Sequence, residues 1–96
     1  MFWLARIDRL SRVATHQERP VADYVRDRTW ITASGMLSPR TLAHALAFVS
    51  VERVPLSTDY PFGHVDRPAV DRSLAALPDE PQRELVAWRN AARAVN

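Results

Sequence analysis

Asp59 is the residue of this 96-residue chain whose position best suits chemistry. It follows Arg53–Thr58, a stretch that ends in Leu-Ser-Thr and that we expect to be a strand, with Pro55 favouring a strand start or an edge position. A carboxylate at the carboxyl end of a parallel strand can bind a divalent cation or act as a general base. Spacing alone favours a plainer interpretation, in which Asp59 is a turn aspartate before Tyr60-Pro61.

The other polar candidates lack the partners that their chemistry needs. His64 lies five residues beyond Asp59, but a zinc site takes three or more protein ligands, so we interpret His64 as a loop residue. Ser34 and Ser57 lack the Gly-x-Ser-x-Gly context of a nucleophile, and no base is placed beside them. The chain has only 2 glycines, which excludes a glycine-rich phosphate loop.

The charges of the chain are interleaved along its length. All 13 basic residues are arginine, 11 residues are acidic, and the formal net charge is +2. Nucleic-acid binding needs clustered positive charge, so this pattern argues against it. Cysteine is absent, which excludes disulfides and thiolate metal ligands. No apolar run approaches the roughly 20 residues of a membrane span, and we expect a cytoplasmic location.

Hydrophobic spacing and capping residues predict five helices and two strands. The expected helices cover 2–14, 21–26, 38–50, 66–77 and the segment from 79 onward, and the expected strands cover 29–32 and 53–58. Ser38, Asp66 and Asp79 are the predicted N-caps. Two strands joined through one helix make a parallel βαβ unit, which predicts the α/β class. Because parallel sheets are normally wider than two strands, the sequence predicts that this chain is a segment of a larger protein.

The segment Glu52-Arg53-Val54-Pro55-Leu56-Ser57-Thr58-Asp59-Tyr60-Pro61-Phe62 resembles a stretch of the amidohydrolase-related family. That family includes the aminocarboxymuconate semialdehyde, resorcylate and dihydroxybenzoate decarboxylases. Three further segments match in the family's order, namely residues 2–8, the stretch from Tyr24 through Met36, and Asn90-Ala91-Ala92-Arg93. The resemblance therefore spans almost the whole chain.

The resemblance implies that residues 1–96 are the C-terminal fragment of a metal-dependent (β/α)₈ TIM barrel. The chain would hold strands 7 and 8 with flanking helices, and would be mostly helical by residue count. Asp59 would be a metal ligand or catalytic carboxylate, and Phe62 would line the substrate pocket. The implied cofactor is a divalent metal, with zinc the expected identity. The family's histidine ligands belong to strands that this chain does not contain.

The function that follows is part of a decarboxylase or hydrolase acting on an aromatic or unsaturated carboxylic acid, with no activity expected of the chain alone. Its partner would be a complementing N-terminal barrel fragment or further copies of itself. The alternative is a non-catalytic α/β interaction module derived from that family. Such a module would form homo-oligomers and bury the stripe of Trp3, Ile7 and Leu10.

Overall fold

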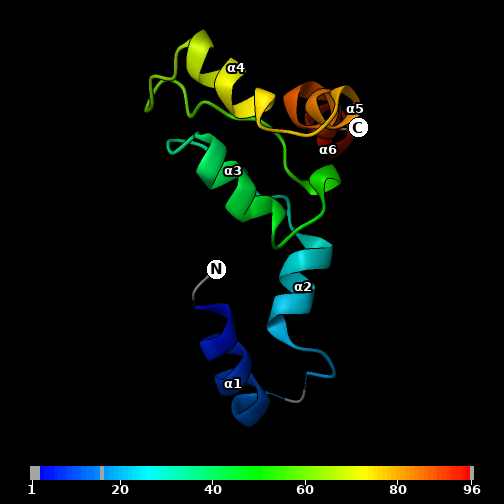
Figure 1. Cartoon of the computed structure of the whole chain (residues 1–96). Coiled ribbons are helices and arrows are strands. Elements are labelled where there is room, and N and C mark those ends of the chain that lie inside the picture. Colours follow the sequence, from blue (N-terminus) through cyan, green and yellow to red (C-terminus); the bar gives the residue numbers. More distant parts are fainter. Residues whose placement is uncertain (1–2, 16, 96) are drawn as a thin grey trace.

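The protein consists of helices and the segments that connect them (Figure 1). A computed structural model describes residues 3–15 and 17–95. A short 3₁₀ turn, η1, precedes the long connection to α4, and a π-helical turn, η2, joins α5 to α6. The elements in chain order are α1 (Leu4–Ala14), α2 (Val21–Arg28), α3 (Pro39–Leu46), η1 (Val51–Arg53), α4 (Arg67–Ala75), α5 (Glu80–Glu84), η2 (Leu85–Arg89) and α6 (Asn90–Val95).

Three helices begin at the side-chain caps that the sequence predicts. Ser38 Oγ accepts a hydrogen bond from the Thr41 backbone N–H at 3.1 Å. The carboxylates of Asp66 and Asp79 accept in the same way from the third residue beyond them, each at 2.9 Å. Each cap satisfies a backbone donor that a helix leaves unpaired in its first turn. The helix starts are therefore fixed by local sequence.

The predicted helix over 2–14 is observed as α1, and Phe2 lies outside the described residues. Within the part of the chain that the structure describes, no helix is long and apolar enough to cross a membrane.

The predicted strands are wrong, and with them the assignment to an α/β class with barrel strands 7 and 8. Residues 29–33 and 54–59 have no regular secondary structure, and no strand occurs among the described residues. One backbone hydrogen bond joins the two predicted strands, from the Ile31 N–H to the carbonyl of Arg53, the last residue of η1, at 3.0 Å. A strand requires a repeating ladder of such bonds.

The second segment forms its backbone hydrogen bonds with the C-terminal helices instead of with the first segment. The Leu56 N–H donates to the Val86 carbonyl of η2 at 2.8 Å. Pro55 has no N–H to offer a neighbouring strand. The side-chain amide of Asn90 donates hydrogen bonds to the carbonyls of Val51 and Val54. Backbone hydrogen-bonding groups of the second segment thus find their partners on the C-terminal helices. The described structure is helical, with extended connections between the helices.

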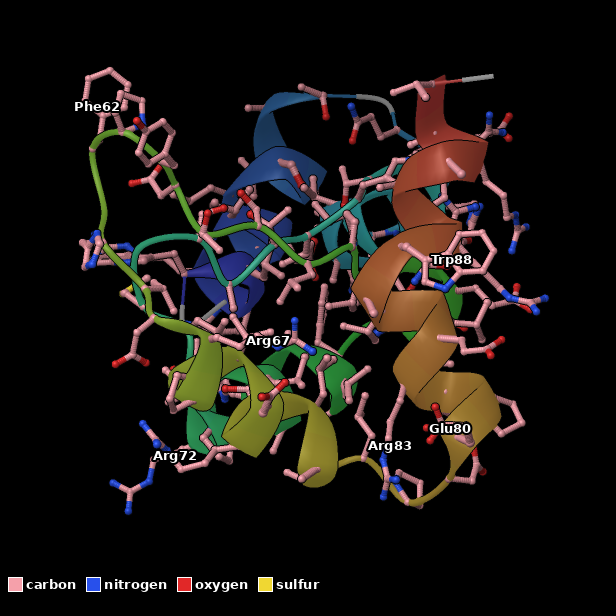
Figure 2. All side chains as sticks on the ribbon, turned by 90° about the horizontal axis from the view of Figure 1, so that it is seen from above. Phe62, Arg67, Arg72, Glu80, Arg83 and Trp88 are labelled. Carbon is pink, nitrogen blue, oxygen red and sulfur yellow. The ribbon has the colours of Figure 1, made fainter. Side chains whose placement is uncertain are left out.

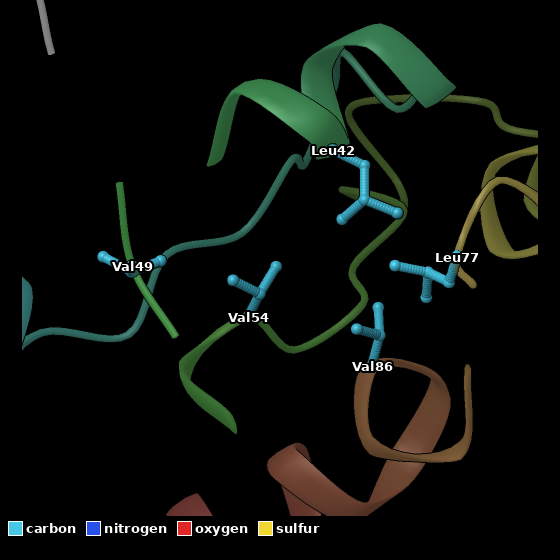
Figure 3. Close-up of a cluster of buried hydrophobic side chains, with 5 residues drawn as sticks. All are labelled: Leu42, Val49, Val54, Leu77 and Val86. Carbon is cyan, nitrogen blue, oxygen red and sulfur yellow. The ribbon is translucent and has the colours of Figure 1, made fainter. Parts of the chain in front are cut away.

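The hydrophobic core lies where α3, the segment after η1, and the C-terminal helices meet (Figure 3). Its fully buried members are Leu42, Val49, Val54, Leu77 and Val86. Partly buried side chains from both extended segments, including Ile31 and Leu56, pack against this cluster. The core therefore fixes the path of the chain up to Leu56, three residues before Asp59.

The α1–α2 hairpin projects from this core (Figure 1). The structure measures 46 × 25 × 25 Å, with a Cα radius of gyration of 15.1 Å. A compact domain of the same length has a radius of gyration of about 12.5 Å. The hairpin is held together in part by Asp8, whose carboxylate accepts a hydrogen bond from the Ala22 N–H at 2.9 Å.

Candidate functional site

Asp59 lies in the turn that ends the second extended segment, in an unusual backbone conformation. Its φ is +63°, and it is the one non-glycine residue of the described chain with a positive φ. Such a conformation is uncommon outside glycine, although aspartate tolerates it better than most residues. The turn closes with a hydrogen bond from the Gly63 N–H to the Asp59 carbonyl at 2.8 Å, and it contains a cis Tyr60-Pro61 peptide bond.

Both glycines of the chain lie against Asp59. A Cβ on Gly35 would be 3.3 Å from Asp59 Oδ2, and Gly35 itself has a φ of +72°. A Cβ on Gly63 would be 3.0 Å from the Thr58 carbonyl oxygen and 3.3 Å from the Asp59 Cβ. Glycine at position 35 lets its loop approach the Asp59 carboxylate closely, and glycine at position 63 lets the turn close on the backbone and Cβ of Asp59. The loop after the first extended segment and the turn after the second therefore meet at Asp59.

The segment that leads to Asp59 is anchored by Asn90, whose side chain is fully buried. Asn90 Nδ2 donates to the Val51 carbonyl at 2.7 Å and to the Val54 carbonyl at 3.1 Å. Its Oδ1 is buried without a hydrogen-bond partner. The adjacent η2 is a π-helical turn, a distortion that is often found near functional sites. Asn90 thus ties α6 to the backbone five residues before Asp59.

The carboxylate itself and the aromatic side chains that follow it are exposed. Tyr60 is 82% exposed and Phe62 is 92% exposed. Phe62 projects outward from the tip of its loop, away from the helices (Figure 2). The structure brings neither ring against Asp59 in a closed pocket. The role predicted for Phe62 as a wall of a substrate pocket stays a prediction.

His64 and Asp59 do not form a metal site by themselves. His64 lines an open depression of about 370 Å³ with residues 35–37, 65–66, Ala69 and Arg72. Within 3–15 and 17–95, no group of three or more histidine, cysteine, aspartate or glutamate side chains is placed to hold a metal. Because a catalytic metal usually takes three protein ligands, the donor set of this chain does not fit a complete metal centre.

Charged side chains elsewhere form exposed pairs, as the interleaved sequence suggests. Arg67 and Asp71 are paired at 2.8 Å, and Arg89 and Glu84 are also paired at 2.8 Å. The pairing of Asp27 with Arg19 lowers the pKa of the carboxyl group, chiefly through the hydrogen bond between them. Exposed pairs of this kind contribute little to stability.

Two features of the site escape a reading of the sequence. The contact between Gly35 and Asp59 joins residues 24 positions apart. The hydrogen bonds from Asn90 reach Val54 and Val51, which lie 36 and 39 positions earlier in the sequence. One signal could have pointed to the first feature, because a chain with only 2 glycines uses each for a specific backbone need.

Sequence comparison finds relatives among decarboxylases, whereas no family model matches the chain. Gamma-resorcylate decarboxylase of Polaromonas sp. is 31% identical over 74 residues, which cover 77% of this chain and 22% of that protein. Decarboxylase orsB of Emericella nidulans is 36% identical over 78 residues, which cover 78% of this chain and 24% of that protein. The chain belongs to the amidohydrolase-related family. It corresponds to the C-terminal part of these relatives and spans about a quarter of their length.

Solved structures of the family share the path of almost the whole chain. The 5-carboxyvanillate decarboxylase LigW of Sphingomonas paucimobilis matches with a TM-score of 0.79 and 31% identity, over 96% of this chain and 29% of its own. A dihydroxybenzoic acid decarboxylase of Polaromonas sp. matches with a TM-score of 0.73 and 27% identity, over 96% of this chain and 29% of its own. That structure contains manganese and the inhibitor 2-nitroresorcinol.

Proposed function

We propose that this chain is the C-terminal segment of a larger metal-dependent decarboxylase that acts on an aromatic carboxylic acid. In that enzyme, Asp59 contributes one carboxylate to a divalent metal, and Phe62 contacts the substrate. The chain alone is inactive in this proposal, because the remaining ligands and the substrate pocket lie in the rest of the enzyme. The cytoplasmic location expected from the sequence stays a prediction.

The geometry around Asp59 is the observation that carries the proposal. A non-glycine residue with a positive φ is conformationally costly, and such costs concentrate at functional sites. Both glycines of the chain make room for this one side chain. Because aspartate in a turn tolerates this conformation, the approach of Gly35, 24 positions away in the sequence, is the feature that a solvated turn aspartate would not need. The decarboxylase relatives support the reaction class, and the manganese in one solved neighbour supports a divalent metal.

The role of the metal is limited by what the chain supplies. A divalent cation at this position would polarise oxygens of a bound carboxylic acid. The described residues provide one oxygen donor toward it and no cluster of three. Asp59 is therefore proposed as one member of a ligand set completed by another segment, and metal binding by the chain alone is expected to be weak.

A chimera tests the proposal directly. This chain replaces the matching segment of the Polaromonas gamma-resorcylate decarboxylase, and the chimera is compared with its Asp59→Asn variant. The expected result is a loss in metal affinity and in kcat/KM greater than about a hundredfold, more than the tenfold to hundredfold cost of changing an outer-shell partner. Metal content and decarboxylation of gamma-resorcylate are the two measurements.

Asp71→Asn is the matched control, because it removes one exposed carboxylate from α4 and breaks only a surface pair. It should leave both measurements within about twofold of the unmodified chimera. An active chimera in which Asp59→Asn binds metal and turns over normally would refute the role of Asp59.

The non-catalytic module is separated from the enzyme segment by the behaviour of the chain alone. Sedimentation in the presence and absence of manganese or zinc measures its oligomeric state. Discrete dimers that are indifferent to metal would favour the module. A monomer that joins the missing part of a decarboxylase would favour the enzyme segment.

A further inference from the structure

The C-terminal helices contain one turn in which the hydrogen-bond pattern changes. Residues Leu85–Arg89 form the π-helical turn η2, and the Asn90 N–H that follows it donates to the Leu85 carbonyl, five residues earlier. In a regular α-helix this N–H would donate four residues back, to the Val86 carbonyl. The π turn therefore frees the Val86 carbonyl from that donor. The Leu56 N–H of the second extended segment takes its place, at 2.8 Å.

The residue that follows the π turn holds the same segment at two further points. The side-chain amide of Asn90 donates to the carbonyls of Val51 and Val54, at 2.7 and 3.1 Å. Asn90 is fully buried, and Val54 and Val86 both point into the core (Figure 3). Three hydrogen bonds thus run between residues 86–90 and the backbone of residues 51–56. In a regular α-helix the Val86 carbonyl would be shared between Leu56 and the ladder of the helix itself.

These bonds end three residues before Asp59, whose φ of +63° lies outside the regions that most residues adopt. Asp59 and Tyr60 are both exposed, so core packing does not hold them. The turn itself is closed by the bond from the Gly63 N–H to the Asp59 carbonyl. A costly φ persists only where the surrounding structure determines it. The bonds to residues 51–56 fix the direction in which the chain enters this turn.

We propose that η2 and Asn90 form a positioning device for the Asp59 carboxylate, and that the additional residue of the π turn makes the device possible. Asn90 is a positioning residue in this proposal, because it acts through the backbone of the segment before Asp59. The inference rests on the proposed function, since the position of the carboxylate matters only if Asp59 takes part in the reaction. The buried Oδ1 of Asn90, which has no hydrogen-bond partner, supports it, because an amide kept at that cost is kept for its donors.

Deletion of Ala87 tests the π turn. Without this residue the Leu85 carbonyl lies four positions before Asn90, so the bond between them becomes α-helical and the Val86 carbonyl meets the N–H of Ala91. The helix keeps its ladder on both sides, while Leu56 loses the free carbonyl. Asn90→Ala, the second variant, removes the two side-chain bonds.

Asp79→Ala is the matched control. It removes the N-cap of α5, at the start of the same run of helices, where the Asp79 carboxylate bonds to Gln82. The loss of such a cap destabilises a protein measurably, but this one leaves the bonds to residues 51–56 in place. A role of Asn90 in stability alone would therefore make the control behave like the two test variants.

Two readouts are compared, each at a temperature where circular dichroism shows the variant to be folded. NMR couplings that report φ are measured for Asp59 in the free chain, and kcat for gamma-resorcylate is measured in the chimera. Asn90→Ala and the deletion of Ala87 are expected to average the φ of Asp59 over positive and negative values. Both are expected to lower kcat by at least about tenfold, whereas Asp79→Ala keeps the positive φ and stays within about twofold.

The proposal is overturned if Asp59 keeps its positive φ in both test variants, if φ changes while kcat does not, or if Asp79→Ala lowers kcat as much as they do. Either test variant decides alone where the other does not fold. The φ readout uses the free chain and is independent of catalysis. A retained φ beside an Asp59-dependent chimera refutes this inference alone, and a changed φ beside normal turnover by the Asp59→Asn chimera refutes the proposed function.

Discussion

Replacing Asn90 with alanine is expected to destabilise the chain by about 2 kcal/mol, within a range of about 0.5–3.5 kcal/mol. The change removes the donor of two hydrogen bonds, one of which leaves the carbonyl of the buried Val54 unpaired. An unpaired buried carbonyl costs about 1–3 kcal/mol, and the loss of the second, partly solvated bond to Val51 costs about 0.5–1.5 kcal/mol. Part of this cost, about 1 kcal/mol, is offset because the variant also removes Oδ1, which is buried without a partner.

Urea unfolding followed by circular dichroism measures the free energy of unfolding, and hydrogen exchange measures the protection of the Leu56 N–H. Leu56 lies in the segment that Asn90 anchors, and its N–H donates to the Val86 carbonyl. The protection of this N–H should therefore fall in Asn90→Ala. Asn90→Asp keeps the shape but turns an acceptor toward two carbonyls, and it should cost at least as much as Asn90→Ala. Gln82→Ala is the control, because its amide makes one long 3.3 Å contact at an exposed position.

The reasoning would be refuted if Asn90→Ala cost less than about 0.5 kcal/mol, or if Asn90→Asp matched the unmodified chain. Either result would mean that Val51 and Val54 do not need the side-chain amide. The anchoring of the segment before Asp59 would then have to come from the core alone.

Two further predictions concern the backbone at the site and a surface pair. Gly35→Ala should cost about 1–2 kcal/mol in urea unfolding, because φ is +72° and the new Cβ meets Asp59 Oδ2 at 3.3 Å. Gly35→Asn should cost less, since asparagine tolerates this conformation better, and equal costs would contradict the argument. The carboxyl of Asp27 should titrate by NMR below its ordinary pKa, because Arg19 stabilises the charged form. Its contribution to stability is present above the ordinary aspartate pKa and is lost as the pH falls through the lowered pKa, whereas Arg19→Gln should raise the midpoint toward the ordinary value, with Arg26 and Arg53 still lowering it.

The sequence alone determined the features that depend on near neighbours. Ser38, Asp66 and Asp79 each cap a helix through a bond to the third residue onward, and no distant part of the chain is needed for that. The family resemblance was also readable, because the motif around Asp59 is a local string of residues. Asp59 was singled out on the same ground, while its proposed role still awaits the chimera.

Only the tertiary structure decided how the two extended segments are used. Their apolar, β-branched composition predicted strands, but a strand exists only when a neighbour supplies a ladder of backbone partners. Here Val86 and Asn90, which belong to the C-terminal helices, form the hydrogen bonds with the backbone of the second segment. The meeting of Gly35 with Asp59 is likewise a contact between distant positions. Such pairings depend on which surfaces the fold brings together, and residue preferences along the chain do not encode that choice.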